Sequence, residues 1–178
     1  TTNFDLALET SKNLTFNIIN SKGFTRFYPW EKYASEYQLQ NPLNGFGIWH
    51  IHGMILHPDS IRLGLTDYMG SVEKARKWIH KGEASLFRGK DQAYWRGRYS
   101  WLHIWFNMPL IIVGLKLESQ EVFIRWLLIE RERYFRKFED RRKKTVFLST
   151  GTDTVIENYL TNLNIQHKTT AQYADLYK

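Results

Sequence analysis

The chain has 178 residues, which is long enough for one domain with a sizeable hydrophobic core. Its hydrophobic content of 43% and aromatic content of 16% predict a folded chain and exclude an intrinsically disordered one. The sequence contains no cysteine, which excludes disulfide-stapled scaffolds and zinc sites built on thiolates. Its formal charge of +7 suits an anionic partner such as a nucleotide, a nucleic acid or an acidic protein.

The most apolar stretch lies at residues 101–115 and includes His103, Asn107 and Pro109. At roughly fifteen residues, this stretch is too short and too polar to cross a bilayer. The sequence shows no signal-peptide pattern either. We therefore expect a cytoplasmic protein without a membrane partner.

The first part of the chain mixes short periodic segments with breakers. Apolar spacing at residues 5–20 predicts a short helix followed by a strand. Residues 21–45 are aromatic and broken by glycine and proline, which predicts a loop region. Residues 46–53 predict a strand that stops at a glycine. After a turn at 58–60, residues 61–64 predict another short strand.

The middle of the chain has helical spacing. Ser71 is predicted to cap a helix that extends to Lys81. Residues 90–107 predict a second helix with an interruption at Gly97. Pro109 ends this helix, because the residue before a proline is disfavoured in the α region.

The last part alternates strands and helices. Residues 110–114 form a β-branched run typical of a strand buried on both faces of a parallel sheet. A capping serine then begins an amphipathic helix over 119–144. A strand at 145–149, a turn and helix at 151–164 and a last strand from 165–167 follow. This order predicts an α/β fold with a parallel sheet. The side chains expected to face inward from the long helix are Phe123, Trp126, Leu127, Tyr134 and Phe138.

An amide and a carboxylate, Asn3 and Asp5, lie two residues apart at the start of the chain. Ligands of parallel sheets bind beyond the carboxyl ends of the strands, where such a pair can hold ribose hydroxyls or an amide. The alternative is a helix cap, because Asn and Asp often precede the first helical turn. The local pattern alone favours the cap.

His52 and Gly53 stand at the end of a predicted strand. A histidine there can act as a general base near neutral pH. His50 lies two residues earlier, so a strand would place both rings on one face. That spacing also suits a metal pair, but no third ligand is evident and we expect no metal site. The commoner alternative is a structural histidine hydrogen-bonded at a strand end.

Two further features concern anions. Residues 113–118 contain a strand end, Gly114 and then Lys116 before a predicted helix, which is a suitable seat for a phosphate, although such turns are frequent. Residues 125–144 hold nine Lys or Arg against four acids. Three pairs of opposite charge are spaced i,i+4 and suggest a solvated helix face: Glu132–Arg136, Glu139–Lys143 and Asp140–Lys144. The alternative is a nucleic-acid contact by the basic cluster at 141–144.

Taken in order, these segments resemble the SIR2-like domains, the broad group that includes sirtuins. Residues 1–5 resemble the family's Thr-x-Asn-x-Asp motif. Residues 48–53 resemble its His-Gly motif, which puts His52 at the position of the catalytic histidine. Residues 112–117 are similar to the later strand with Gly-x-Ser-Leu that contacts the ADP-ribose half. Residues 122–128 are similar to the bacterial, defence-type branch.

The resemblance implies a three-layer Rossmann-like α/β fold made by a single domain over 1–178, with a helical insertion over 66–108. It implies that NAD+ is the ligand and that its nicotinamide–ribose bond is cleaved. Asn3 would orient ribose or water, Asp5 would hold the carboxamide and His52 would be the base. The residues expected to contact the cofactor are Thr2, Asn3, Asp5, Gly53, Gly114 and Lys116.

The sequence departs from the family pattern in three places. The glycine-rich turn that grips the pyrophosphate would precede Thr1, so we expect an incomplete N-terminal part and little activity from these residues alone. The zinc ribbon of the deacylating members is replaced by residues 66–108, which argues against zinc and against a deacylase. Lys116 stands where the family usually has a hydroxyl residue.

The leading hypothesis from the sequence is NAD+ hydrolysis by the intact protein in bacterial anti-phage defence. One alternative is an NAD-dependent protein deacylase. Another is a degenerate domain that serves binding or assembly, with a homo-oligomer or a partner subunit held by the aromatic residues within 94–106. In that case the basic cluster at 141–144 would be the place to look for nucleic acid.

Overall fold

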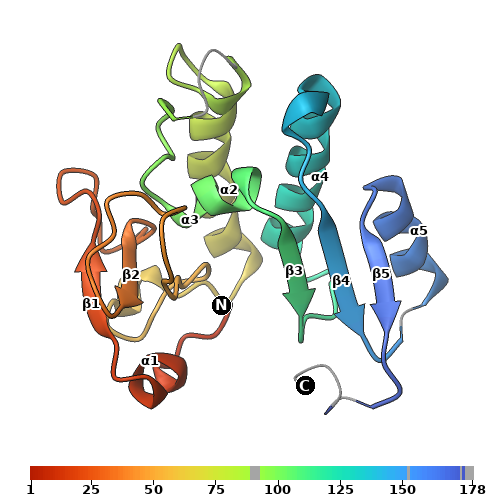
Figure 1. Ribbon diagram of the computed structural model, residues 1–178, viewed down its shortest axis with the longest axis horizontal. Helices are drawn as coiled ribbons and strands as arrows, with labels where there is room; N and C mark the ends of the chain where they lie inside the picture. The colour runs from red at the N-terminus through yellow and green to blue at the C-terminus, as the bar shows by residue number, and fades with distance from the viewer. Residues whose placement is uncertain (89–92, 152, 173, 175–178) are drawn as a thin grey trace. The chain divides into compact units, whose positions relative to one another are not determined.

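The computed structural model describes residues 1–88, 93–151, 153–172 and 174 (Figure 1). The chain separates into two compact units, residues 1–104 and residues 105–178, which we call the first and the second unit. Among the described residues, no helix combines the length and the apolar character that crossing a bilayer requires.

The first unit begins with helix α1 (Ala7–Ser11) and a two-stranded antiparallel sheet. Strand β1 (Thr15–Ile18) pairs with β2 (Lys32–Ser35). The helix and strand predicted within residues 5–20 are therefore confirmed. The prediction of an unbroken loop over 21–45 is wrong, because β2 lies within it. Its side chains at Tyr33, Ala34 and Ser35 are buried, so tertiary packing stabilises a strand that the local breakers disfavour.

The strand predicted over residues 46–53 is wrong. Within this range only Ile48 makes a β-bridge, with Ala34, and the chain turns at Ile51 and His52. The strand predicted over 61–64 is also wrong, since these residues have no strand conformation. The turn predicted before them is a short 3-10 helix, η1 (Pro58–Ser60).

Helix α2 (Leu65–His80) is the longest element of the first unit. It begins before the predicted cap Ser71, which lies buried inside the helix. The carboxylate of Asp67 accepts from the backbone N–H of Gly64 at 3.4 Å and closes the first turn. A side chain reaching back from the third helical position caps this helix, so the prediction of Ser71 as the cap is wrong.

The helix predicted over residues 90–107 is wrong for most of its length. Helix α3 (Trp101–Asn107) is its only helical part among the described residues, and 93–100 form turns that follow η2 (Leu86–Arg88). The predicted start at Lys90 lies outside the described residues. A Cβ on Gly97 would lie 2.4 Å from the indole of Trp95, so the backbone folds closely over this ring. That residues 66–108 are an insertion stays a prediction.

Most of the aromatic stretch near α3 belongs to the core. Trp95, Trp101, Trp105 and Phe106 are buried, whereas Tyr94 is 70% exposed. An oligomer interface built on this whole stretch would need side chains that the fold already covers. The predicted oligomer itself stays a prediction.

The second unit contains a parallel sheet in the order β3-β4-β5. The strands are β3 (Leu110–Val113), β4 (Thr145–Ser149) and β5 (Gln166–Thr169), and helices α4 (Val122–Lys137) and α5 (Thr154–Asn162) connect them. The predicted α/β class with a parallel sheet is therefore confirmed. The strand–helix–strand order could be recognised because each element has its own hydrophobic period.

The ends of α4 differ from the prediction. Glu121 is the N-cap residue, and the helix stops at Lys137 before a 3-10 turn, η3 (Glu139–Arg141). The predicted capping serine at 119 and the predicted end at 144 are therefore wrong. Leu117 has a positive φ of 55°, so the chain is still turning before the helix starts. Of the side chains expected inward, Phe123, Leu127 and Tyr134 are buried, and Trp126 and Phe138 are half-buried.

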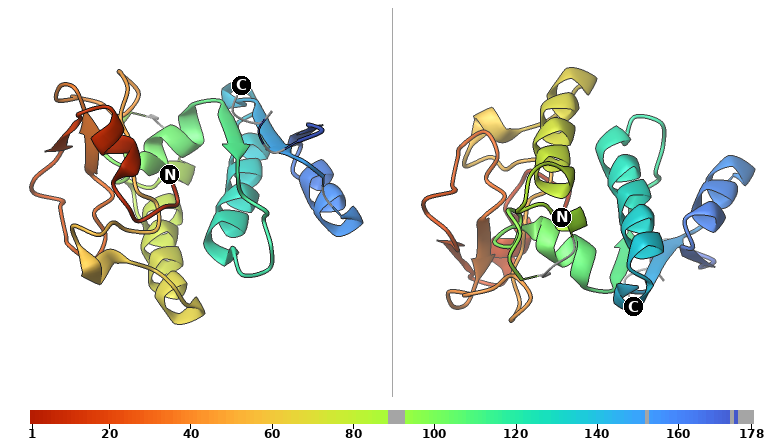
Figure 2. Two further views of the ribbon diagram at one scale, coloured as in Figure 1. Left: turned by 90° about the horizontal axis from the view of Figure 1, so that it is seen from below. Right: turned by 90° about the horizontal axis from the view of Figure 1, so that it is seen from above.

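Figure 2 shows α4 and α5 on the same face of the sheet. Strand β3 alternates between two environments: Ile111 is 70% exposed and Val113 is 39% exposed, whereas Leu110 and Ile112 are partly buried. The prediction that this strand is buried on both faces is wrong for Ile111 and Val113. Consecutive side chains of a strand point to opposite faces, so the two exposed residues share the face away from the helices.

Arg131 organises the amino-terminal ends of β3 and β4. It is 2% exposed, and its guanidinium donates to Thr145 Oγ1 at 3.1 Å and to the carbonyl oxygens of Trp105, Met108 and Lys143. Burial lowers the pKa of Arg131 to about 9, which still leaves the side chain charged at neutral pH. The guanidinium of Arg131 thus satisfies three backbone carbonyls, at the end of α3 and before the starts of two strands, and one threonine hydroxyl.

Candidate functional site

The first five residues lie alongside residues 49–55 within the first unit. The backbone N–H of Ile51 donates to the Thr1 carbonyl at 3.0 Å, and that of Ile55 donates to the Phe4 carbonyl at 3.0 Å. The Thr1 nitrogen donates to the Trp49 carbonyl at 2.8 Å. Both segments advance in the same direction along these contacts. The backbone that carries Asn3 is therefore held next to the backbone that carries the histidine–glycine pair.

His50 is the centre of this contact. Its Nδ1 lies 2.7 Å from the Asn3 carbonyl oxygen, and its Nε2 lies 2.7 Å from Glu9 Oε1. His50 and Glu9 are each 2% exposed. Sequence reasoning grouped His50 with His52 and overlooked Glu9. The only local signal was an acidic residue within a short helix, and its partner is far away in the sequence.

His52 is 4% exposed, and its ring packs edge-on against Tyr68 with centroids 5.1 Å apart. Burial lowers the pKa of His52 to about 4. The imidazole is therefore neutral at physiological pH and able to accept a proton. Neighbouring His50 is engaged elsewhere, so the two histidines of the pair have separate roles.

Gly53 is required by the backbone. Its φ is +100°, and a Cβ placed there would lie 2.2 Å from the carbonyl oxygen of Ser60. The N–H of Met54 donates to Ser60 Oγ at 3.0 Å, and the N–H of Arg62 donates to the His52 carbonyl at 3.0 Å. Residues 52–62 thus form a tight loop closed beneath His52. That Gly53 also contacts a cofactor stays a prediction.

The polar residues at the chain start do not cap the following helix. Asp5 Oδ1 accepts from the N–H of Ala7 at 2.9 Å, but Leu6 is the N-cap residue of α1 and no side chain caps this helix, so the cap interpretation is wrong. This contact uses one carboxylate oxygen. The side chains of Asn3 and Asp5 are exposed and can be reached by a ligand, and Thr2 is half-buried. Their roles toward a ligand stay predictions.

The second unit carries a groove of about 660 Å³ at the carboxyl ends of β3 and β4. Gly114, with a φ of +73°, begins the loop that forms one wall. Lys116 is on this loop and its side chain is 85% exposed, 3.8 Å from Glu118. The size is in the range of small-molecule sites. The location agrees with the rule that ligands of parallel sheets bind at this edge.

Sequence reasoning missed the other wall of the groove. It consists of residues after β4 and at the start of α5, including Ser149, Gly151 and Asp153. Ser149 Oγ lies 2.9 Å from His167 Nε2, and Asp153 caps α5 by accepting from the N–H of Ile156 at 2.8 Å. The strand-end rule that identified Gly114 applies equally after 145–149, so this wall could have been predicted.

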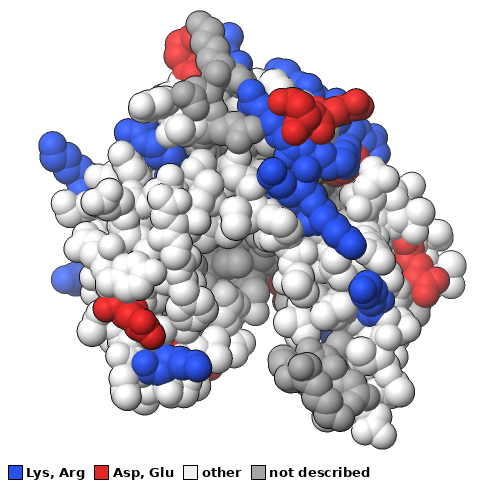
Figure 3. Space-filling model, viewed as in Figure 1, with Lys and Arg blue, Asp and Glu red and all other residues white. Residues whose placement is uncertain are grey.

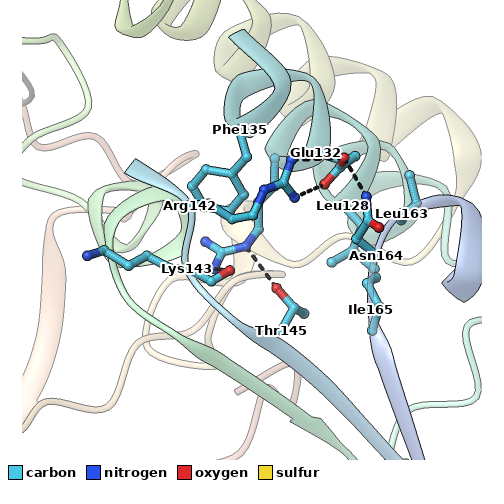
Figure 4. A pocket seen from close by; sticks show the side chains of 10 residues that line it. Leu128, Glu132, Phe135, Arg142, Lys143, Thr145, Leu163, Asn164 and Ile165 are labelled. Carbon is cyan, nitrogen blue, oxygen red and sulfur yellow. Dashed lines mark hydrogen bonds and ion pairs between the residues drawn. The ribbon is translucent and has the colours of Figure 1, made fainter. Parts of the chain in front are cut away.

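The basic run on α4 is partly neutralised from within. The buried Glu132 accepts from Arg136 at 2.9 Å, from Arg142 at 2.7 Å and from Asn164 at 2.8 Å, as Figure 4 shows for Arg142 and Asn164. The predicted pair Glu132–Arg136 is thereby confirmed. Because α4 ends at Lys137, the predicted pairs beyond it lose their helical spacing. Figure 3 shows basic side chains gathered at this end of α4 around acidic ones. A nucleic-acid contact there stays a prediction.

In the first unit the candidate groups for chemistry are the Asn3 amide, the Asp5 carboxylate and the neutral imidazole of His52. Among the described residues, no three His, Asp or Glu side chains gather closely enough to hold a metal ion. A family model described as a SIR2-like domain matches residues 1–168. No curated protein and no solved structure matches the chain. The matched range includes residues 1–5 and 49–55 of the first unit and the groove residues of the second.

Proposed function

This chain belongs to the SIR2-like domain family, and we propose that the intact protein binds NAD+ and hydrolyses its nicotinamide–ribose bond. The products are nicotinamide and ADP-ribose. We place the activity in the cytoplasm, in bacterial anti-phage defence. One observation carries the proposal: residues 1–5 pair with residues 49–55 and so hold Asn3 in the segment next to His52.

The leaving group of this reaction needs no general acid. The bond between the ribose C1′ and the pyridinium nitrogen breaks, and its electron pair goes to the ring, so nicotinamide leaves as a neutral molecule. The ribose passes through an oxocarbenium-like state, as in glycoside hydrolysis. Water then adds to C1′ and must lose a proton. The protein has to orient the ribose and the water and to accept that proton.

His52 is the proton acceptor in this proposal. Its ring is neutral at pH 7, since burial lowers its pKa to about 4. Water becomes strongly acidic as its oxygen bonds to the cationic carbon, so a weakly basic imidazole is sufficient. The loop closed beneath the ring by Gly53 and Ser60 limits its movement, which suits a base that must be prepositioned.

Asn3 and Asp5 supply orientation. The Asn3 amide would hydrogen-bond a ribose hydroxyl or the attacking water, and Asp5 would accept from the nicotinamide carboxamide N–H. One Asp5 oxygen already accepts from Ala7 N–H, which fixes the carboxylate and leaves the other oxygen for the ligand. Thr2 and Gly53 would add contacts on the same side.

The groove of the second unit would by itself bind ADP-ribose. Gly114 lets the backbone approach a phosphate closely, and the exposed ammonium of Lys116 would pair with the diphosphate. Lys116 occupies a place where a hydroxyl is usual in the family, so we expect a larger electrostatic contribution to binding here. Affinity for ADP-ribose should then decrease as salt increases.

The decisive experiment measures nicotinamide released by the intact protein and by His52→Ala. Loss of a general base typically reduces turnover by roughly 100-fold or more, and we expect at least that loss. His57→Ala is the matched control, because His57 lies in the same unit, hydrogen-bonded to Lys32 Nζ at 3.1 Å. It should keep full turnover.

Three results would argue against the proposal. Unchanged turnover in folded His52→Ala would remove the base assignment. Removal of an acetyl group from a lysine peptide, strictly dependent on NAD+, would favour the deacylase alternative. A folded intact protein that neither binds nor cleaves NAD+ would favour a domain used for binding or assembly.

A further inference from the structure

We propose that Glu9 and His50 are positioning residues for the Asn3 loop, joined by one shared proton. The inference rests on the proposed function, since positioning matters only if Asn3 orients the reacting groups. It goes beyond the motif residues, because neither side chain touches the ligand in the mechanism above. Its basis is the continuous path from Glu9 Oε1 through the His50 ring to the Asn3 carbonyl, with 2.7 Å at each contact.

The direction of these hydrogen bonds follows from their chemistry. A backbone carbonyl can only accept, so His50 Nδ1 must carry a proton and donate it to Asn3. His50 Nε2 then has two options. It donates to the Glu9 carboxylate as part of an imidazolium, or it accepts from a protonated Glu9. In both states the Nδ1 proton stays on the Asn3 carbonyl.

Burial protects the hydrogen bonds of Glu9 and His50 from competition by water. Glu9 and His50 are each 2% exposed, so water cannot easily replace either partner. Glu9 Oε2 is also buried and has no hydrogen-bond partner among the described residues. A carboxylate kept under these conditions needs a specific function, because a buried polar group without its partner is costly. Fixing the ring that holds Asn3 is such a function.

The Glu9–His50 pair also connects α1 to the backbone of Asn3. Asp5 Oδ1 accepts from the N–H of Ala7, the first residue of this helix, at 2.9 Å, and Glu9 extends from the same helix to His50. Residues 3–5 are therefore held at both ends, by His50 at Asn3 and by α1 at Asp5. Removing the ring contact would free the Asn3 end while the Asp5 end stays in place.

The test compares Glu9→Leu and His50→Leu with Glu9→Gln, using NAD+ turnover and ADP-ribose binding by the intact protein. An error of about 1 Å in a reacting group can cost roughly 100-fold, so we expect the two Leu variants to lower kcat by roughly 30- to 100-fold. Binding of ADP-ribose should stay within about 2-fold, because neither Glu9 nor His50 touches the ligand.

Glu9→Gln is the conservative rescue. Its amide donates to His50 Nε2 and leaves the Nδ1 donation to Asn3 intact, so kcat should stay within about 5-fold of wild type. The exposed Glu36 in the same unit supplies the matched control, and Glu36→Leu should leave kcat unchanged. If Glu9 and His50 only stabilised the fold, the Leu variants would have a lower folded fraction but an unchanged kcat per folded molecule. Glu9→Gln would then have the same kcat as the Leu variants.

The outcomes separate the inference from the proposed function. Full kcat in folded Glu9→Leu would overturn the inference and leave NAD+ hydrolysis intact. If wild type releases no nicotinamide, the proposed function fails, and the positioning contact is judged by nitrogen NMR of the His50 ring. A bonded proton on Nδ1 in wild type and Glu9→Gln that exchanges rapidly in Glu9→Leu would support the contact. The same spectrum in all three would overturn it.

Discussion

In the second unit three parallel strands pair in register and two helices cover one face of the sheet, whereas among the described residues of the first unit only β1 and β2 form paired strands. The first unit instead relies on side chains that bind distant backbone groups. His50 holds the Asn3 carbonyl, and Ser60 Oγ accepts from the N–H of Met54. One unit is stabilised mainly by repeated backbone pairing, and the other by individual contacts.

This difference suggests that the two units have different roles in the proposed function. Irregular backbone can place polar groups at positions that regular elements do not offer, and the candidate catalytic residues Asn3, Asp5 and His52 all lie in such backbone. Regular strands give a groove whose edge is set by the sheet, and Gly114 and Lys116 lie at that edge. Binding residues on loops supported by a rigid scaffold are a common arrangement. The following substitutions test whether the two units differ in this way.

The largest effect is expected from Gly53→Ala. The new Cβ would meet the Ser60 carbonyl at 2.2 Å, and the φ of +100° disfavours any L side chain. We expect the free energy of unfolding to decrease by about 3–5 kcal/mol. Hydrogen exchange followed by mass spectrometry should show faster exchange in residues 1–88, with residues 105–151 little affected.

Gly82→Ala is the control for this substitution. Gly82 also has a positive φ, +80°, but the nearest atom is the flexible end of Arg96 at 3.3 Å. Its cost should therefore be about 1–2 kcal/mol, from the backbone conformation alone. Equal costs at the two glycines would show that the loop around Gly53 can move away from Ser60. The first unit would then be less dependent on its individual contacts than we argue.

The corresponding substitution in the second unit is Arg131→Met, with an expected loss of about 3 kcal/mol. It removes the donors to Thr145 Oγ1 and to three carbonyl oxygens, and a buried acceptor left unpaired is costly. Urea unfolding measures the loss, and exchange should increase in the peptides of β3 and β4. Lys144→Met, at an exposed neighbouring position, should change stability by less than about 0.5 kcal/mol.

A small loss in Arg131→Met would mean that the regular pairing of β3 with β4 is sufficient by itself. The comparison between the units would then become sharper, since the second unit would tolerate the loss of a buried arginine and its hydrogen bonds. A loss confined to the peptides of α3 would instead locate the role of Arg131 at the end of that helix, where it holds the Trp105 carbonyl.

The same difference explains what could be predicted from the sequence. In the second unit, β3, β4, β5, α4 and α5 were all predicted, because each has a local hydrophobic period. The errors there concern ends and faces. The start of α4 was misplaced because Leu117 adopts a positive φ, and a leucine gives no sequence signal of this conformation. The exposure of Ile111 was missed because a β-branched run looks the same whether one face or two are covered.

In the first unit, the contacts that decide the structure join residues far apart in the chain. The run at residues 46–53 has the pattern of a strand, but its backbone hydrogen-bonds residues 1–4. The His50 ring hydrogen-bonds Glu9 and the Asn3 carbonyl. Likewise, Asp67 rather than Ser71 determines where α2 begins. The motif residues Asn3, Asp5 and His52 could be selected from sequence by resemblance, but their supporting residue Glu9 could not. The residues around Glu9 give no indication that its partner is His50.

A third prediction concerns pH and the buried His103. Trp95 Nε1–H donates to His103 Nδ1 at 3.0 Å, so this nitrogen is an acceptor. Burial, with a smaller effect of the Arg98 charge, lowers the pKa of His103 from 6.5 to about 4. The unfolded chain therefore binds a proton between these values that the folded chain does not. Folded stability decreases as the pH is lowered through this window, by about 2 kcal/mol between pH 7 and pH 5.

His103→Asn tests this assignment, because an amide oxygen can accept from Trp95 without titrating in this range. Urea unfolding at pH 7 and pH 5 should show a loss smaller by about 2 kcal/mol in the variant than in wild type. His80→Asn, at a half-buried histidine in the same unit, serves as the control for the substitution itself. An identical loss in wild type and His103→Asn would contradict the assignment.

The smallest effect is expected from a pair of neighbours on β3, Ile111 and Ile112. Ile→Val removes one methylene and keeps the β-branched shape, and it costs about 1 kcal/mol where the side chain is packed. Ile112, which pairs with the buried Phe147, should show this cost. Ile111 is 70% exposed, so Ile111→Val should cost less than about 0.3 kcal/mol. Equal costs, measured by urea unfolding, would mean that Ile111 is covered in solution. The sheet would then have two packed faces, as a continuous apolar run suggests, and the stability of the second unit would depend on more than its own helices.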